Sequence, residues 1–220
     1  MASYIDEFTR PINLSPATTA LIVVDMQYAS GSRAHGLGKM LDEQGRLDSA
    51  QYRFDRIENA VIPNNQKLLT CFREVHAKVI YLTVGSVMPD YSDAPAHMRR
   101  FYEATNNHQG TKEHEIVTEL EPQPDEPVFN KVTMGGFAST GLGSYLTTHG
   151  IETVVVTGVS TNNCVGMTGM EAADRGFGVV LASDASGTCS DEMQSAFERT
   201  FERLWGRVAQ TQSIIEEMKS

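Results

Sequence analysis

The sequence predicts an α/β protein with three layers, α/β/α, around a central, mostly parallel sheet of about six strands. Two observations lead to this prediction. Continuous runs of Val, Ile and Leu alternate with segments of helical periodicity, which is typical of a parallel sheet covered by helices on both faces. The chain of 220 residues contains no internal repeat, low-complexity tract or linker, so we expect one domain over residues 1–220.

Predicted strands and helices alternate along the chain. We expect strands at residues 19–25, 78–85, 126–131, 152–158, 178–184 and at the start of 208–218. We expect helices at 57–77, 140–150, 162–175, 190–206 and in the remainder of 208–218. Gly150 and Gly176 are C-terminal helix signals, and Ser190 is a candidate N-cap.

Two connections are too long for a compact α/β unit. Residues 26–56 separate the first strand from its helix, and residues 86–113 follow the second strand. Segments of this length without evident structure are usually lids or interaction arms. Both would emerge at the same edge of the sheet, so they are expected to close over a site there; contact arms between subunits, without a catalytic role, are the alternative.

Composition restricts the partners. A net charge of −10 disfavours nucleic acid and anionic membranes. No run approaches the ~20 apolar residues of a membrane-spanning helix, and the first ten residues lack the pattern of a signal peptide. Cys71, Cys164 and Cys189 form neither a disulfide framework nor a zinc pattern. We expect a cytoplasmic protein that acts on a small molecule.

Three reactive side chains lie at or just after the ends of predicted strands: Asp25, Lys131 and Cys164. Ligands of parallel α/β sheets bind outside the carboxyl ends of the strands, so these groups are expected at one site. Each also has a plainer interpretation. Asp25 is then a turn residue, Lys131 a solvated surface residue, and Cys164 a small buried apolar side chain.

The combination suits nucleophilic catalysis. A thiol has an ordinary pKa of about 8.5 and becomes a nucleophile when a base takes its proton or a cation stabilises the thiolate. Asp25 is the candidate base, and Lys131 would stabilise the charged states. Backbone N–H groups at the start of the helix around Cys164 would favour a thiolate and bind an oxyanion. Attack on an acyl or carbamoyl carbon, followed by thioester hydrolysis, needs no cofactor.

Three segments, "LIVVDMQ", "FNKVTMGGF" and "TGVSTNNCV", resemble the isochorismatase-like cysteine hydrolases from roughly Ala20 to Ala209. The amidohydrolase branch is most similar, with N-carbamoylsarcosine amidohydrolase, ureidoacrylate amidohydrolase and biuret hydrolase as examples. The resemblance implies a Rossmann-like fold and a triad of Asp25, Lys131 and the nucleophile Cys164. It also implies a cis peptide bond before Ser160, with the Ser160 and Cys164 N–H groups forming the oxyanion hole.

Differences between this sequence and those of related families narrow the expected reaction. Isochorismatases proper lack the cysteine, so Cys164 points to hydrolysis of a C–N bond. Nicotinamidases carry a metal site after the second strand, built from an Asp-x-His segment and a further histidine. Here Asp90 is followed by Tyr91 and Ser92, and His97 stands alone, so we expect no catalytic metal and no cofactor. Relatives are commonly dimers or tetramers, which implies a homo-oligomer.

Five residues are candidates for binding the substrate. Gln27 would bond Asp25 or the substrate, Tyr28 would form one wall, and Phe137 would pack near the substrate or in the core. Arg99 or Arg100 would close over a carboxylate or ureido oxygen, with a solvated surface position as the alternative. The expected activity is hydrolysis of a small amide, ureido or carbamoyl compound. Ester or lactam hydrolysis and a thiol sensor on the same scaffold remain open.

Overall fold

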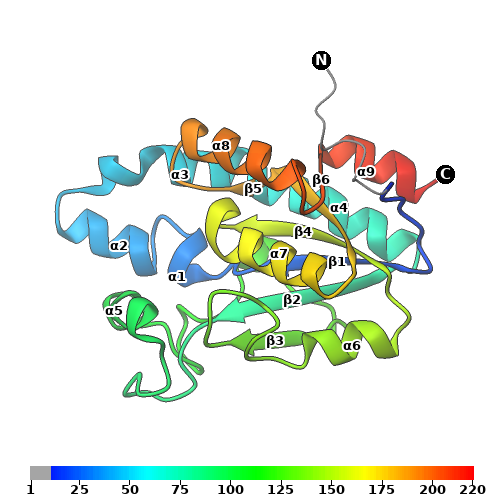
Figure 1. Cartoon of the computed structure of the whole chain (residues 1–220). Coiled ribbons are helices and arrows are strands. Elements are labelled where there is room, and N and C mark those ends of the chain that lie inside the picture. The colour runs from blue at the N-terminus through cyan, green and yellow to red at the C-terminus, as the bar shows by residue number, and fades with distance from the viewer. Residues whose placement is uncertain (1–10) are drawn as a thin grey trace.

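The computed structural model describes residues 11–220. Its centre is a six-stranded sheet in the order β3-β2-β1-β4-β5-β6, in which every neighbouring pair is parallel (Figure 1). The strands are β1 (Thr19–Val24), β2 (Lys78–Val84), β3 (Val128–Lys131), β4 (Thr153–Val159), β5 (Gly178–Gly187) and β6 (Arg207–Ala209). The predicted α/β class and the six strands are confirmed, and β5 extends three residues beyond its predicted end.

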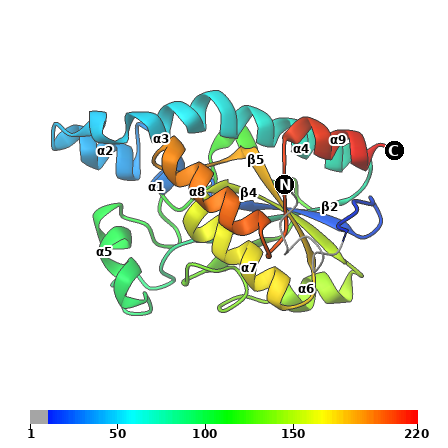
Figure 2. The same ribbon diagram turned by 45° about the horizontal axis from the view of Figure 1, so that its top comes forward.

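Helices cover both faces of the sheet, as Figure 2 shows. In β1, Leu21 and Val23 pack into one apolar cluster while Ile22 and Val24 pack into the other, because alternate strand residues point to opposite faces. The first cluster lies under α4 (Ile62–Glu74) and α9 (Thr211–Met218). The second lies under α6 (Leu142–Thr148), α7 (Gly166–Asp174) and α8 (Asp191–Glu202). The three predicted layers are therefore present.

The connection after β1 differs from the expectation that it lacks regular structure. It contains α1 (Tyr28–Gly31), α2 (Gly36–Glu43), the 3₁₀ turn η2 (Leu47–Ala50) and α3 (Gln51–Arg56). Helix α3 continues through the π-helical turn η3 (Ile57–Val61) into α4, so the helix predicted from residue 57 begins six residues earlier. Phe54 is the one fully buried apolar residue of α3, and one such residue makes no visible helical period.

The connection after β2 carries α5 (Ala96–Ala104), and the 3₁₀ turn η4 (Thr118–Leu120) follows before β3. Val84, Met98 and Tyr102 form a small apolar cluster with their neighbours. Both long connections therefore pack as ordered structure at the carboxyl edge of the sheet, where Figure 1 shows α2 and α5 beyond the strand ends.

The ends of β1 and β4 lie against each other at this edge. Gly158 has φ +105°, and a Cβ placed there would lie 2.1 Å from the Val24 carbonyl oxygen, so only glycine allows this approach. Asp25, the next residue after β1, also has a positive φ, +53°. A non-glycine residue in this region is uncommon and typical of functional sites. The π-helical turn η5 (Thr161–Val165) follows β4 and leads into α7.

Candidate active site

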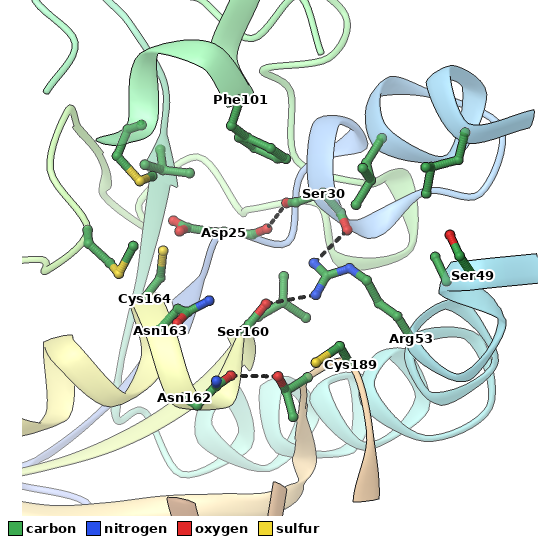
Figure 3. Close-up of a pocket in the computed structure, with 18 residues that line it drawn as sticks. Asp25, Ser30, Ser49, Arg53, Phe101, Ser160, Asn162, Asn163, Cys164 and Cys189 are labelled. Atoms are coloured by element: carbon green, nitrogen blue, oxygen red, sulfur yellow. Dashed lines mark hydrogen bonds between the residues drawn. The ribbon is translucent and has the colours of Figure 1, made fainter. Parts of the chain in front are cut away.

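A cavity of about 400 Å³ opens at the carboxyl edge of the sheet (Figure 3). Asp25 reaches it from the end of β1, Ser160 and Cys164 from the segment after β4, and Arg53 from α3. Helices α2 and α5 and the segment after β3 supply most of the apolar wall: Leu37, Leu41, Met98, Phe101 and Met134. Its size and its few convergent polar groups are typical of a site for a small molecule.

Asp25 and Lys131 form a buried ion pair. Lys131 Nζ donates to Asp25 Oδ2 at 2.8 Å, and the two side chains are 0% and 2% exposed. Lys131 also donates to the Thr133 carbonyl oxygen at 3.3 Å, while Ser30 Oγ holds the Asp25 carbonyl oxygen at 2.8 Å. Asp25 Oδ1 is buried and accepts no hydrogen bond from the residues that the structure describes, so this oxygen is available to take a proton.

Cys164 is buried, and its side chain points toward the Asp25 carboxylate (Figure 3). Burial, together with the negative charge of Asp25, raises the pKa of the Cys164 thiol to about 12, although Lys131 opposes this. The helix amides were expected to favour a thiolate, but the loss of solvent around the buried sulfur disfavours the thiolate more strongly. Burial also raises the pKa of Asp25, partly offset by Lys131. The arrangement is a neutral thiol beside a carboxylate that is more basic than usual.

The backbone after β4 leaves an amide group free close to Cys164 in the sequence. The Val159–Ser160 peptide bond is cis, as the family resemblance implies. The Ser160 carbonyl accepts from Asn163 and Val165 at 2.9 and 3.2 Å, while the Ser160 N–H has no acceptor among the described residues. Asn163, with φ −121° and ψ −105°, interrupts the helical path just before Cys164. A free amide at a helix start suits an oxyanion.

Three of the predicted substrate-binding residues do not line the cavity. The Gln27 amide is bonded to the backbone: Oε1 accepts from Val84 N at 2.8 Å, and Nε2 donates to the carbonyls of Val84 and His114 at 3.2 and 2.8 Å. Tyr28 bonds Thr118 at 2.7 Å, outside the cavity. Phe137 packs into the second apolar cluster. Gln27 was expected to bond Asp25 or the substrate, but its amide bonds the backbone of Val84 at the end of β2.

Arg99 and Arg100 are also absent from the cavity wall and are exposed. Arg99 donates to the Ser92 carbonyl at 3.0 Å. Helix α5 instead turns Met98 and Phe101 toward the cavity. The second long connection therefore reaches the site as predicted, but with apolar side chains, because α5 buries its apolar stripe there.

Arg53 lines the cavity but is not among the residues that the sequence singled out. Its guanidinium lies in the cavity wall and donates to Ser160 Oγ at 2.7 Å and to the Ser30 carbonyl at 2.9 Å (Figure 3). Burial lowers the pKa of Arg53. The one available signal was the position of residues 26–56 beside the predicted site, since Arg53 belongs to no motif.

No group of three or more His, Cys, Asp or Glu side chains within residues 11–220 is arranged to hold a metal ion. Asp90, in the segment where nicotinamidases carry their metal site, accepts the backbone N–H of Ser92 at 3.0 Å and closes a local turn. Cys71 is buried in the first apolar cluster, and Cys71, Cys164 and Cys189 are all free thiols. Over the same residues, no helix is long and apolar enough to cross a membrane.

The family model of the isochorismatase domain matches residues 19–213, so the chain belongs to the isochorismatase family. It is 31% identical over 214 residues to the ureidoacrylate amidohydrolase RutB of Rhizobium rhizogenes, covering 90% of this chain and 82% of that protein. The family resemblance seen in the sequence is thereby confirmed. The predicted enzyme class, an amidohydrolase acting on non-peptide C–N bonds, agrees with this relative.

Solved structures share the fold. A cysteine hydrolase from Pseudomonas syringae pv. phaseolicola superimposes with a TM-score of 0.78 at 25% identity, covering 96% of both chains. N-carbamoylsarcosine amidase from Thermoplasma acidophilum superimposes with a TM-score of 0.65 at 24% identity, covering 88% of this chain and 96% of that one. The second likeness speaks for the fold alone.

Proposed function

We propose that the protein is a cysteine amidohydrolase that cleaves a C–N bond of a small amide, ureido or carbamoyl compound through a thioester on Cys164. One observation carries this proposal: Cys164 and Asp25 line the same cavity, and Asp25 Oδ1 has no hydrogen-bond partner among the described residues while Lys131 holds Oδ2 at 2.8 Å. The names of the relatives, ureidoacrylate amidohydrolase and cysteine hydrolase, support the same class of reaction.

In the first half of the reaction, Asp25 Oδ1 takes the thiol proton while Cys164 Sγ attacks the carbonyl carbon. Because the pKa of Cys164 is about 12, proton removal has to accompany the attack, and the raised pKa of Asp25 makes it a better base. The carbonyl oxygen becomes an oxyanion that the Ser160 and Cys164 N–H groups bind. Asp25 then gives the proton to the leaving nitrogen, the C–N bond breaks, and ammonia or an amine departs.

In the second half, water attacks the thioester carbon and Asp25 takes its proton. The tetrahedral intermediate forms in the same oxyanion hole, the C–S bond breaks, and the proton returns to Cys164 Sγ. The acid product leaves, and the enzyme is restored with one water consumed for each C–N bond cleaved. Burial disfavours the charged form of Lys131, but the Asp25 carboxylate holds the pKa of Lys131 above the ordinary value, so Lys131 stays protonated throughout. The cycle requires no metal or cofactor.

Two alternative activities use the same residues. An ester or lactam would pass through the same thioester. A thiol sensor needs a low-pKa, accessible thiol, and the buried Cys164 with a raised pKa weighs against that role. We therefore place amide, ureido or carbamoyl hydrolysis first.

We further propose that the chain acts as one domain in the cytoplasm and forms a homo-oligomer. The three free thiols, with Cys189 exposed, fit a reducing compartment. Val87 and Met88, 48% and 49% exposed in the second long connection, offer apolar surface for a contact between subunits.

The test is ammonia release from a panel of small primary amides, ureido acids and carbamoyl compounds. Cys164→Ala is expected to lose roughly four orders of magnitude in kcat, since removal of a nucleophile has effects of this size. Cys71→Ala is the matched control, because it removes another free, buried thiol that does not line the cavity, and it should keep activity within about threefold. Equal activity of wild type and Cys164→Ala on every substrate that reacts would overturn the proposal.

A further inference from the structure

Arg53 is a cation in the cavity wall without a carboxylate partner among residues 11–220. Its two hydrogen-bond acceptors, Ser160 Oγ and the Ser30 carbonyl, are both neutral. Its Nε is buried and has no acceptor among the described residues. A guanidinium taken out of water needs a charged partner or a full set of acceptors, and Arg53 has neither within this part of the chain.

Two other arginines, Arg33 and Arg73, are paired with carboxylates. Arg33 bonds the carboxylates of Asp55 and Glu58 at 2.7 and 2.9 Å, and Arg73 bonds Glu126 at 2.7 Å. Asp55 lies on the same helix as Arg53, yet it is directed to Arg33. Arg56 also donates to carbonyl oxygens, those of Ser183 and Ser186, but its Nε has an acceptor and it does not line the cavity. Arg53 lines the cavity, and its buried Nε has no acceptor among the described residues.

The remaining charges of the cavity do not neutralise Arg53. Asp25 is the one carboxylate among the described residues that line it, and its Oδ2 is bonded to Lys131 at 2.8 Å. One negative and two positive side chains leave a net charge of +1 at the site when Asp25 is ionised. An anionic group on the substrate would balance it, and a guanidinium fork matches a carboxylate in geometry.

Arg53 also lies next to the proposed oxyanion hole. It bonds the side chain of Ser160, whose N–H is part of the proposed oxyanion hole. A substrate whose carbonyl carbon meets Cys164 therefore needs only a short spacer to bring a second group to Arg53. The cavity of about 400 Å³ and its apolar walls from Met98 and Phe101 suit a spacer of a few carbon atoms.

We propose that Arg53 binds a substrate carboxylate, so that the preferred substrates are short carboxylic acids bearing the scissile amide, ureido or carbamoyl group. This inference rests on the proposed function. A different role would make Arg53 a stabiliser of the oxyanion through Ser160. The two roles differ in one measurable respect, because an oxyanion forms from every substrate whereas a carboxylate is present only in some.

The experiment compares 3-ureidopropionate with n-butylurea, which has a similar length but no carboxylate. Wild type should turn over the acid with a kcat/KM at least about tenfold higher. Arg53→Gln should lower kcat/KM for the acid by about 10-fold to 100-fold, which is the usual effect of losing hydrogen bonds to a charged group. Most of this loss should come from a higher KM. The kcat/KM for n-butylurea should stay within about threefold of the wild-type value. Arg99→Gln, which removes an exposed guanidinium of α5, is the matched control and should change neither value.

An equal decrease in kcat/KM for both substrates in Arg53→Gln would overturn the proposal in favour of the oxyanion role. An unchanged kcat/KM for both would show that Arg53 does not bind the substrate. A wild type that does not prefer the acid overturns it without any variant, so a folding defect cannot hide the answer. Arg53→Lys keeps the charge but not the fork and should be intermediate.

Binding to the Cys164→Ala protein separates this inference from the proposed function. By calorimetry, the Cys164→Ala protein should bind 3-ureidopropionate, and the double variant Cys164→Ala with Arg53→Gln should bind it with a Kd about 10-fold higher or more. Binding of the acid no tighter than that of n-butylurea overturns carboxylate recognition. Hydrolysis that persists in Cys164→Ala overturns the proposed function instead, whatever the binding result.

Discussion

Two cations of the cavity region, Lys131 and Arg53, have opposite surroundings. Lys131 is fully buried and bonded to the Asp25 carboxylate at 2.8 Å. Arg53 donates to two neutral oxygens, and its Nε has no acceptor among the described residues. Lys131 comes from the end of a sheet strand, whereas Arg53 comes from a helix of the first long connection.

The difference separates chemistry from recognition. A cation already paired with a carboxylate can hold that carboxylate in place while protons move, but it has little attraction left for a ligand. A cation without a counterion is costly to keep in the free protein and gains most when an anion arrives. In the proposed mechanism, the sheet edge carries the reacting groups, and the helical connection carries the group that selects the substrate.

Among substitutions that test this comparison, Asp25→Asn should change kcat the most. An amide cannot accept the thiol proton, so kcat should fall roughly a thousandfold, as for other general bases. The same change removes a negative charge that raises the pKa of Cys164, so alkylation of Cys164 by iodoacetamide at neutral pH should become faster. Both rates are measured on one preparation.

These two changes in opposite directions distinguish a base from a structural residue. A partly unfolded protein would also alkylate faster, so circular dichroism and a thermal melt of Asp25→Asn accompany the rates. Hydrolysis retained within tenfold of wild type would show that Asp25 is not the base.

Lys131→Met and Arg53→Met compare the two cations by stability. Lys131→Met leaves the buried Asp25 without its partner, which should lower the free energy of unfolding by about 3–5 kcal/mol. Arg53→Met strands no protein charge and loses two bonds to neutral oxygens, so it should cost about 1 kcal/mol or less. Urea denaturation measures both, and Asp25→Asn combined with Lys131→Met should recover part of the loss. A cost for Arg53→Met equal to that for Lys131→Met would contradict the contrast.

The pH dependence of kcat/KM gives a smaller effect. Asp25 acts in its ionised form, and burial raises its pKa above the ordinary value of 3.8. Activity should therefore fall as the pH drops through this raised value, with an acid limb above pH 3.8. The thiol reacts from its neutral form, so its pKa of about 12 leaves no alkaline limb near the ordinary thiol value of about 8.5. A fall in kcat/KM at alkaline pH near that value would show that Cys164 ionises in the free enzyme, provided that the protein remains folded over the same pH range.

The sequence was sufficient for the part of the site that the sheet builds. Asp25, Lys131 and Cys164 follow strand ends, and parallel strands bring their carboxyl ends to one edge, so their proximity could be predicted without coordinates. Gln27 was expected to bond Asp25 or the substrate, but its amide bonds the backbone of β2, where Val84 offers both an N–H and a carbonyl.

The part built by the helical connections could not be predicted in this way. Whether Arg53 or Arg99 faces the cavity depends on how α3 and α5 pack, and both arginines lie in polar sequence without a motif. The sequence offered several arginines in the two connections, and the structure brings Arg53 to the cavity wall while leaving Arg99 exposed. Local periodicity does not determine such tertiary placement.

The central claim is that Cys164 carries the substrate's acyl or carbamoyl group during turnover. The most direct measurement is acid quenching of wild type during hydrolysis, followed by peptide mass spectrometry. The account predicts an adduct on the peptide containing Cys164, released by hydroxylamine, and more of it early in turnover than after the substrate is exhausted. Steady turnover with no adduct on Cys164, or an adduct confined to Cys189, would contradict it.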